Sequence, residues 1–227
     1  MRLLSNQSAT PTCRVIRIAL DGASFHYRAG QAASLAAGDR DGLTPYSIAS
    51  APSETVRDGW LEFLVKVDGS SRFGAVVDGL QPGRAIRVQG PAGNFTLSDL
   101  SPDTPLLFVA GGTGIAPLRS MIREALDAGH AGNMALVYSA RSPNEFAYAS
   151  ELRSLAEQGR LTVTLTLTGD AEEWRHARGR TGPSHLSDLV RAETLAYVCG
   201  PPAMVRDVPA ALTAMGLSPA RIRTEDW

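Results

Sequence analysis

Cysteine is scarce in this sequence. Only two cysteines occur among the 227 residues, Cys13 and Cys199, and they lie far apart. One disulfide is possible in principle, but a framework of several disulfides is excluded. Two thiols are also too few for the four ligands of a usual iron–sulfur cluster or for a cysteine-rich zinc site. Since the four histidines show no spacing typical of metal ligands, the sequence predicts no metal site.

A charge bias and long apolar runs are absent as well. Lys and Arg total 22 against 23 Asp and Glu, which gives a formal net charge of −1. Such a chain has no overall field that attracts nucleic acid or an anionic membrane, so neither is an expected partner. The longest apolar stretches, such as residues 106–110, are far too short to span a bilayer, and the N-terminus turns polar before a signal-peptide core can form. We therefore expect a cytoplasmic protein without membrane insertion.

The first hundred residues have the pattern of a β protein. Residues 15–18, 61–67 and 85–88 are predicted strands, separated by glycine- and proline-containing turns, and a short helix is expected at 72–79. Short strands at this spacing, with almost no helical periodicity, predict a small antiparallel barrel or sandwich.

After Pro105 the pattern changes to alternating strands and helices. This alternation predicts an open parallel sheet with helices on both faces. The segment 98–105 is rich in Ser, Asp and Pro, so we predict one domain of residues 1–101 and a second of residues 102–227. The predicted strands of the second domain are 106–110, 135–138, 161–167 and 195–198, and its predicted helices are 117–128, 147–158 and 203–215.

A glycine-rich turn follows the first strand of the second half. It consists of Gly111, Gly112, Thr113 and Gly114, and Pro117 lies in the first turn of the next helix. Glycines let the backbone approach a pyrophosphate, whose charge is favoured by free N–H groups at a helix N-terminus. Pro117 suits that position because its missing N–H loses no hydrogen bond there. We interpret the turn as a nucleotide phosphate site; the alternative is a turn that only packs the helix on the strand.

A second loop is expected at the same edge of the sheet. Residues 199–204 contain a glycine followed by two prolines, which cannot continue the strand before them. Cys199 is expected to face the crevice or lie just beneath it, and the alternative is a small buried apolar residue. No histidine lies nearby in sequence to activate it, so we do not expect a nucleophile.

Arg141 follows the second strand of the predicted parallel sheet. In nucleotide-binding sheets this loop lies near the adenosine ribose, where a cation can hold a 2′-phosphate. The alternative is an ordinary exposed arginine. The choice between NADH and NADPH depends on this residue alone.

Six segments form a series of motifs along nearly the whole chain, residues 25–31, 46–50, 80–83, 90–95, 111–117 and 199–204. Together and in this order they resemble the motifs of the ferredoxin–NADP reductase family. They are similar to its aromatic-to-Pro-Gly-Gln turn, its Arg-x-Tyr-Ser flavin strand, two later barrel turns, its nicotinamide-nucleotide turn and its Cys-Gly-Pro-x-x-Met loop. The resemblance implies a six-stranded antiparallel FAD-binding barrel followed by a parallel-sheet NAD(P)-binding domain.

The resemblance also implies FAD and NAD(P)H as cofactors and assigns residue roles. Tyr46 would pack against the flavin ring and Ser47 would hydrogen-bond near N5, the hydride acceptor. Cys199 and Gly200 would border the nicotinamide, so Ser47 and Cys199 are the predicted catalytic residues. Trp227 or Glu225, in the terminal segment 225–227, would lie near the flavin, with a frayed terminus as the alternative. The predicted cofactor-binding residues are Thr44, Tyr46, Ser47, Ser50, Arg72, Gly74, Gly111, Gly112, Thr113, Gly114, Pro117, Arg141, Cys199, Gly200, Pro201, Met204 and Trp227.

Two positions depart from the family's pattern. Thr44 stands where the flavin strand usually has an arginine that neutralises the FAD pyrophosphate, and Gly74 stands where a helix usually offers Ser or Thr. Loss of one charge-assisted contact weakens binding by about 1.5–3 kcal/mol. Arg72 lies close enough in sequence to compensate. We therefore predict FAD binding that is weaker than in typical members, with a flavin that can exchange.

These observations predict an NAD(P)H-dependent flavoprotein reductase. It would pass electrons through FAD to a separate ferredoxin or iron–sulfur protein, since this chain cannot hold its own cluster. An alternative is an NAD(P)H:flavin reductase that releases reduced flavin, which Thr44 and Gly74 favour. A third alternative, of another class, is a non-catalytic flavin- or nucleotide-binding regulatory module. The intact segments 46–47 and 199–200 argue against it, because they serve the transfer step.

Overall fold

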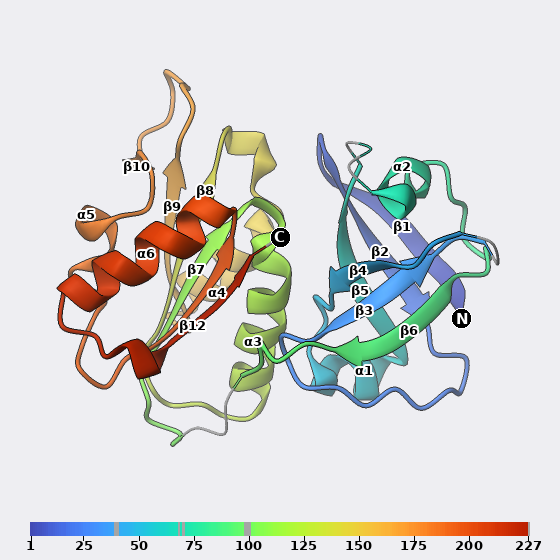
Figure 1. Cartoon of the computed structure of the whole chain (residues 1–227), viewed down its shortest axis with the longest axis horizontal. Helices are drawn as coiled ribbons and strands as arrows, with labels where there is room; N and C mark the ends of the chain where they lie inside the picture. The colour runs from blue at the N-terminus through green and yellow to red at the C-terminus, as the bar shows by residue number, and fades with distance from the viewer. Residues whose placement is uncertain (39–40, 68, 70, 98–100, 227) are drawn as a thin grey trace. The chain divides into compact units, whose positions relative to one another are not determined.

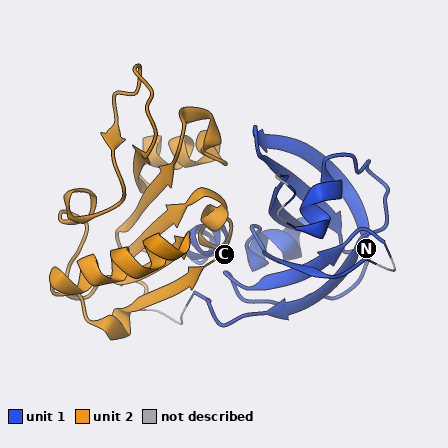
Figure 2. Cartoon of the chain, turned by 45° about the horizontal axis from the view of Figure 1, so that its top comes forward, with its two compact units in different colours: residues 1–98, 119–128 blue, residues 99–118, 129–227 orange. Residues whose placement is uncertain are grey.

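The computed structural model describes residues 1–38, 41–67, 69, 71–97 and 101–226 (Figure 1), and the chain divides into two compact units (Figure 2). Unit 1 comprises residues 1–98 together with 119–128, and unit 2 comprises residues 99–118 together with 129–227. Helix α3 (Ile115–Asp127) therefore begins in unit 2, and most of it belongs to unit 1. The sequence pattern did not indicate this division within α3, and the expected domain boundary after residue 101 stays a prediction.

Unit 1 is built on antiparallel strands. Those among its described residues are β1 (Arg2–Thr10), β2 (Cys13–Ala19), β3 (Ala32–Ala36), β4 (Thr44–Ser47), β5 (Trp60–Lys66) and β6 (Arg87–Ala92). They form two three-stranded sheets with the orders β1–β2–β5 and β4–β3–β6. Isolated antiparallel bridges join the sheets at both edges, one from Arg2 to Ala85 and one from Ile48 to Phe63. The strand order therefore closes on itself, which confirms the predicted six-stranded barrel.

The barrel interior follows from the alternation of side chains along its strands. Ile16 and Ile18 of β2 are fully buried, and so are Leu61, Phe63 and Val65 of β5. Successive side chains of a strand point to opposite faces, so these residues line one side of the sheet.

The sequence pattern missed β1 and β3 because each has few large apolar residues. Leu3 of β1 and Leu35 of β3 are buried, but their neighbours are polar or small. Two short helices accompany the barrel, α1 (Pro52–Asp58), which the pattern also missed, and α2 (Arg72–Val77), which it predicted.

Unit 2 contains a parallel sheet with the strand order β10–β9–β8–β7–β11–β12. Helix α6 (Pro202–Ala214) lies on one face of this sheet and α4 (Ala149–Glu157) on the other (Figure 1), with a short α5 (Pro183–Leu186) preceding β11. The described strands are β7 (Leu106–Gly111), β8 (Met134–Ala140), β9 (Thr162–Leu167), β10 (Ala177–Arg178), β11 (Leu195–Gly200) and β12 (Ile222–Asp226). The predicted parallel-sheet domain is confirmed.

The chain end differs from one of the sequence expectations. Glu225 and Asp226 do not fray but lie in β12, opposite Cys199 and Gly200 of β11. The sequence of β12 is mostly polar, so its pattern does not indicate a strand. Trp227 lies outside the described residues.

Two general findings bear on function. No helix in the described part of the chain is long and apolar enough to cross a membrane. Within the same residues, no group of three or more His, Cys, Asp and Glu side chains is arranged to hold a metal ion. Cys13 and Cys199 are both buried and both free.

Candidate functional site

The two strand-end motifs of unit 2 lie against each other. They follow β7 and β11, which are neighbouring parallel strands. A Cβ atom at Gly114 would lie 2.2 Å from the carbonyl oxygen of Cys199, and one at Gly111 would lie 2.8 Å from Cδ of Pro201. Real Cβ atoms do not approach so closely, so glycine is required at both positions for the loops to meet.

Gly200 and Met204 complete this packing. A Cβ atom at Gly200 would lie 2.8 Å from the Met204 sulfur and 3.2 Å from the Gly111 nitrogen. The Met204 side chain also borders Gly111, whose Cβ would lie 3.0 Å from the Met204 methyl carbon. The structure thus brings together all the predicted nucleotide residues of residues 111–114 and 199–204.

The glycine turn offers backbone N–H groups at a helix start. It forms a short 3₁₀ helix, η1 (Gly112–Gly114), that leads directly into α3. Gly112 has a φ of 54°, which favours glycine. Gly112 and Thr113 are partly exposed, whereas Gly111 and Gly114 are buried, so the tip of the turn is the part that a ligand can reach. N–H groups at a helix start lack intrahelical partners, and they suit an anion.

The position of the turn in the sheet supports the same interpretation. From β7 the sheet continues to β8 and β9 on one side, and β11 and β12 lie on its other side. The strand order therefore reverses between β7 and β11. In open parallel sheets ligands bind beyond the carboxyl ends of the strands at this reversal, which is where both motifs lie.

Cys199 is almost fully buried in this arrangement. Burial raises the pKa of its thiol well above the usual range, and the nearby carboxylates of Glu225 and Asp226 raise it further. The side chain is therefore a neutral thiol near neutral pH, and it is unsuited to act as a base or nucleophile. The catalytic role predicted for Cys199 stays a prediction. With a neutral thiol, that role would be to lie beside the nicotinamide without adding a charge.

Arg141 is exposed just beyond β8. Its backbone N–H donates to the Glu145 carboxylate at 3.2 Å, and no ion pair of its guanidinium occurs among the described residues. The loops after β8 and β9 lie close together, because a Cβ atom at Gly169 would be 2.3 Å from the Arg141 carbonyl oxygen. The Arg141 side chain is thus accessible to a ligand, and its contact with a 2′-phosphate stays a prediction.

Sequence reasoning missed Tyr138, which contacts the glycine turn from β8. Its hydroxyl donates to the Gly112 carbonyl oxygen at 3.0 Å and accepts the Ala147 N–H at 3.3 Å. The signal was a tyrosine inside a fully buried strand whose other residues are apolar or small. A buried tyrosine hydroxyl usually has a specific partner.

In unit 1 the predicted flavin strand is attached to helix α2. The Tyr46 hydroxyl and the Ser71 Oγ are hydrogen-bonded at 2.5 Å, and the Tyr46 ring lies 5.8 Å from the Phe73 ring. Ser71 also caps α2, because its Oγ accepts the Gly74 N–H at 2.9 Å. Tyr46 and its neighbour Ser47 are each half-buried, so both present part of their surface.

Gly74 has a packing reason of its own. A Cβ atom there would lie 2.4 Å from the Lys66 carbonyl oxygen and 2.7 Å from the Ser71 Oγ. The helix therefore cannot offer a hydroxyl side chain at residue 74 without moving away from β5.

Arg72 lies beside the start of the flavin strand. Its side chain is exposed, and a Cβ atom at Gly42 would lie 3.2 Å from the Arg72 Nη1. Gly42 precedes Thr44 by two residues. No hydrogen bond or ion pair of the Arg72 guanidinium occurs among the described residues. The guanidinium is thus close to the position where the family's arginine is replaced.

Ser50 lies in the interior of unit 1. Its hydroxyl accepts the Glu62 N–H at 3.0 Å and is 3.1 Å from both the Tyr27 hydroxyl and the Thr55 Oγ1. Its carbonyl oxygen accepts from Ser120 of α3 at 2.6 Å. The hydroxyl is occupied by protein partners, so the predicted cofactor contact of Ser50 stays a prediction and its observed role is structural.

A buried ion-pair network lies beside Ser50. Nη1 of the buried Arg119 lies 3.0 Å from one Glu54 carboxylate oxygen, 3.7 Å from Glu62, and donates to the Ala49 carbonyl oxygen at 2.8 Å. Burial favours a higher pKa for Glu54. Arg119, the Ala51 N–H and Arg123 outweigh it and hold the pKa below its ordinary value.

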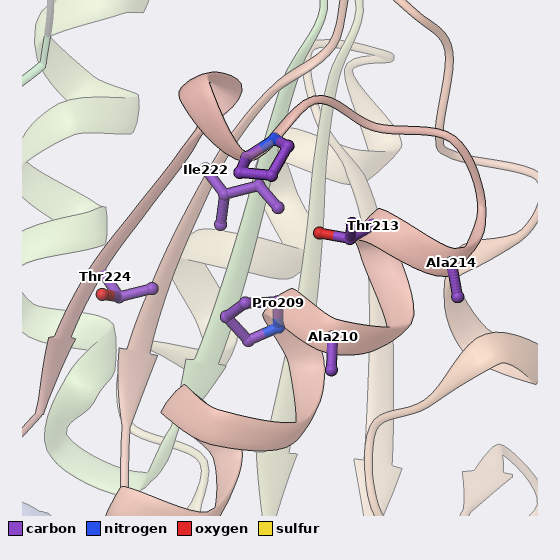
Figure 3. Close-up of a pocket in the computed structure, with 7 residues that line it drawn as sticks. Pro209, Ala210, Thr213, Ala214, Ile222 and Thr224 are labelled. Carbon is purple, nitrogen blue, oxygen red and sulfur yellow. The ribbon is translucent and has the colours of Figure 1, made fainter.

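A cavity of about 620 Å³ lies elsewhere in unit 2 (Figure 3). It is apolar apart from two threonines, and none of the predicted site residues line it. This lining does not suit a phosphate, so we assign no cofactor to the cavity. The lining residues are Pro209, Ala210, Thr213, Ala214, Pro219, Ile222 and Thr224.

Comparison with known proteins places these motifs in a family. The oxidoreductase FAD-binding domain matches residues 1–97, and the oxidoreductase NAD-binding domain matches residues 108–209. Ferredoxin–NADP reductase B of Sorangium cellulosum is 35% identical over 206 residues, which cover 89% of this chain and 82% of that protein. The chain belongs to the ferredoxin–NADP reductase family. The predicted family and its FAD- and NAD-binding domains are thereby confirmed.

Other relatives of this reductase are longer. The reductase component of the naphthalene 1,2-dioxygenase system of Pseudomonas putida is 33% identical, over 95% of this chain and 65% of that protein. The reductase component of propane 2-monooxygenase of Mycolicibacterium smegmatis is 30% identical, over 82% of this chain and 55% of that protein. The chain thus spans between about half and two thirds of these two relatives.

Solved structures show the same fold. A ferredoxin–NADP⁺ reductase from Neisseria gonorrhoeae, with bound FAD and NADP, superposes with a TM-score of 0.83 at 23% identity. That match covers 99% of this chain and 96% of that one. A cytochrome P450 reductase from Amycolatopsis gives a TM-score of 0.87 at 24% identity, over 99% of this chain and 68% of that one. The family matches show that the chain is a flavoprotein oxidoreductase. The solved structures show that it has the same two-domain fold.

Proposed function

We propose that this reductase catalyses electron transfer from NAD(P)H through bound FAD to a separate ferredoxin or iron–sulfur protein. The observation that best supports the proposal is the packing of the glycine turn against residues 199–204 where the strand order of unit 2 reverses. The names of the relatives, a ferredoxin–NADP reductase and reductase components of oxygenase systems, support a protein acceptor.

In unit 2 the residues at hand suit a nicotinamide nucleotide. The backbone N–H groups of Gly112 and Thr113 are proposed to bind the pyrophosphate. The glycines of the turn have no side chains that would keep the pyrophosphate away from the backbone. Cys199 and Gly200 are proposed to border the nicotinamide, where a neutral thiol adds no charge. Arg141 is proposed to bind the 2′-phosphate, which makes NADPH the favoured donor.

In unit 1 the residues suit FAD. Tyr46, held by Ser71, is proposed to pack against the flavin ring, and Ser47 is proposed to hydrogen-bond near N5. When bound, FAD supplies the capacity to accept a hydride and to release electrons singly. Arg72 is proposed to neutralise the FAD pyrophosphate in place of the arginine that Thr44 replaces.

One observation favours a second candidate, an NAD(P)H:flavin reductase that releases reduced flavin. Gly74 has no room for a side chain, and Thr44 has no charge, so two usual phosphate contacts are missing together. A flavin bound mainly by its ring and by Arg72 exchanges more readily than one whose phosphates also have the two usual contacts. The use of NAD(P)H and the two free cysteines support a cytoplasmic location in either case.

The first experiment is purification without added flavin, followed by an absorption spectrum and anaerobic addition of NADPH or NADH. A flavin band at about 450 nm that bleaches with NADPH is expected. Adding a [2Fe–2S] ferredoxin with cytochrome c as final acceptor then tests the protein acceptor, and Arg141→Ala tests the donor preference.

Each candidate has its own outcome in that experiment. A yellow protein that reduces ferredoxin supports the main proposal. A colourless protein that oxidises NAD(P)H only when free FAD or FMN is supplied supports the flavin reductase. A protein that neither binds nor reduces any flavin refutes both and leaves the regulatory module.

A further inference from the structure

Tyr138 occupies a bridging position in unit 2. It lies in β8 with its side chain fully buried, and its ring meets the Phe146 ring edge-on with the centroids 5.1 Å apart. Its hydroxyl donates to the Gly112 carbonyl oxygen at 3.0 Å and accepts the Ala147 N–H at 3.3 Å. One hydroxyl therefore joins the glycine turn after β7 to the segment that follows β8.

The hydrogen bond to Gly112 determines the direction of the next N–H. In a trans peptide the C=O of one residue and the N–H of the next point in opposite directions. The Gly112 carbonyl oxygen is held inward by Tyr138 and also accepts the Ile115 N–H of the same turn. The Thr113 N–H must then point away from Tyr138, toward the exposed side of the turn.

We infer that Tyr138 is a positioning residue for the pyrophosphate of the nicotinamide nucleotide. Its hydroxyl holds the Gly112–Thr113 peptide in the orientation that presents the Thr113 N–H to the phosphate. Gly112 needs this support because its φ of 54° is available to glycine among other conformations of similar energy. Through Ala147 the same hydroxyl ties the turn to the segment beyond Arg141. This inference rests on the proposed function of unit 2 as the nucleotide-binding unit.

The test is Tyr138→Phe, which removes the hydroxyl and keeps the ring. Titration calorimetry with NADP⁺ and NAD⁺ on the oxidised holoprotein should show a Kd about tenfold higher, equivalent to about 1.4 kcal/mol. The KM for NAD(P)H should rise while kcat at saturation, FAD content and the Kd for FAD stay within about twofold of the unmodified protein. The matched control is Tyr197→Phe, an equally buried tyrosine of the same sheet, stacked on Phe108, which should leave all these values unchanged.

Gly112→Ala disturbs the same peptide from its other side, by disfavouring a positive φ, and should cause the same selective loss. If both act on one peptide, the double variant should lose less than the sum of the two single losses. A lower melting temperature with an unchanged nucleotide Kd in Tyr138→Phe would show a structural role only and overturn the inference. Should Tyr138→Phe not fold, an unchanged nucleotide Kd in Gly112→Ala would overturn it equally. Failure of the unmodified protein to bind either nucleotide would instead refute the proposed function.

Discussion

The two units differ in how they build their proposed phosphate sites. In unit 2 the site consists of backbone groups, held by glycines whose missing side chains let Cys199 and Pro201 approach within contact. In unit 1 the site depends on side chains, and the two usual ones are absent at Thr44 and Gly74. A backbone site tolerates almost no added atoms, whereas a charge can be supplied from another position such as Arg72. The packing of unit 2 thus requires the family's glycines, whereas unit 1 can depart from the family's pattern.

The interiors of the units differ as well. Unit 1 buries the charged side chains of Arg119, Glu54 and Glu62 against one another. In the described part of unit 2, buried contacts such as the stacking of Tyr197 on Phe108 join uncharged side chains. We therefore expect acidification, or removal of a single charged side chain, to destabilise unit 1 more than unit 2.

Arg119→Met is expected to have the largest effect. It removes the buried cation that Glu54 and Glu62 share and leaves them only the more exposed Arg123 and Arg17, which costs about 3–5 kcal/mol. Urea unfolding at pH 7 measures this loss. Arg206→Met, at an exposed pair with Asp207, is the control and should change stability by less than about 0.5 kcal/mol. Equal losses in the two variants would contradict the burial argument.

The pH dependence of the same variant sharpens the test. The pKa of Glu54 is held below its ordinary value, so its contribution is present above an ordinary pKa of 4.5 and is lost as the pH falls through the folded pKa. Without Arg119, only the Ala51 N–H and Arg123 oppose the effect of burial on this pKa, so the carboxyl becomes protonated at a higher pH than in the unmodified protein. The stability deficit of Arg119→Met should therefore shrink as the pH is lowered from 7 toward 4. A deficit that is constant with pH would show that Glu54 is not the group left unpaired.

Gly114→Ala tests the packing of unit 2. Its Cβ atom would lie 2.2 Å from the Cys199 carbonyl oxygen, so the turn must move and stability should fall by about 1–3 kcal/mol. Binding of NADP⁺ should weaken with it, while FAD binding in unit 1 should not. Gly182→Ala, whose nearest atom is 3.8 Å away, is the matched control and should bind nucleotide normally. Normal nucleotide binding by Gly114→Ala would contradict the view that the site in unit 2 tolerates fewer changes than the site in unit 1.

Arg72→Gln tests whether unit 1 has replaced its missing charge. The Kd for FAD should rise about tenfold, since one charge-assisted phosphate contact is lost. Equilibrium titration of the apoprotein with FAD, followed by flavin fluorescence, measures this change. Arg84→Gln, another exposed arginine of unit 1, should leave the Kd unchanged. Thr44→Arg should tighten FAD binding, and no effect of either change would place the FAD phosphates elsewhere.

The sequence predicted both folds, and the residues that it proposes for the unit 2 site lie together in the structure, because the signals of both are local. Glycine permits turns that other residues disfavour, and proline cannot continue a strand, so residues 111–114 and 199–204 can be recognised from the sequence as loops at strand ends. Strands β1, β3, β10 and β12 were missed because they are very short or have few large apolar residues. Their pairing depends on neighbours such as β2, β9 and β11 rather than on their own pattern.

Other residues were missed because their roles exist only after folding. Nothing around Arg119 in the sequence shows that it meets Glu54, 65 residues earlier. In the sequence, Tyr138 looks like one more core residue of a buried strand. Only the structure shows that its hydroxyl contacts Gly112. Ser50 was assigned to the cofactor by resemblance, yet Glu62 and Thr55 occupy its hydroxyl in the structure.

Cys199→Ala should have the smallest effect. Burial, together with Glu225 and Asp226, raises the pKa of this thiol far above neutrality, so it holds its proton across the working range. We expect kcat/KM for NAD(P)H to fall by less than about tenfold, well short of the 10²–10⁴-fold contribution of a general acid or base. The pH profile between 6 and 9 should keep its shape, and iodoacetamide should not modify Cys199 in the folded protein. A larger loss with an altered profile would mean that a side chain, and not only packed backbone, is essential at the unit 2 site.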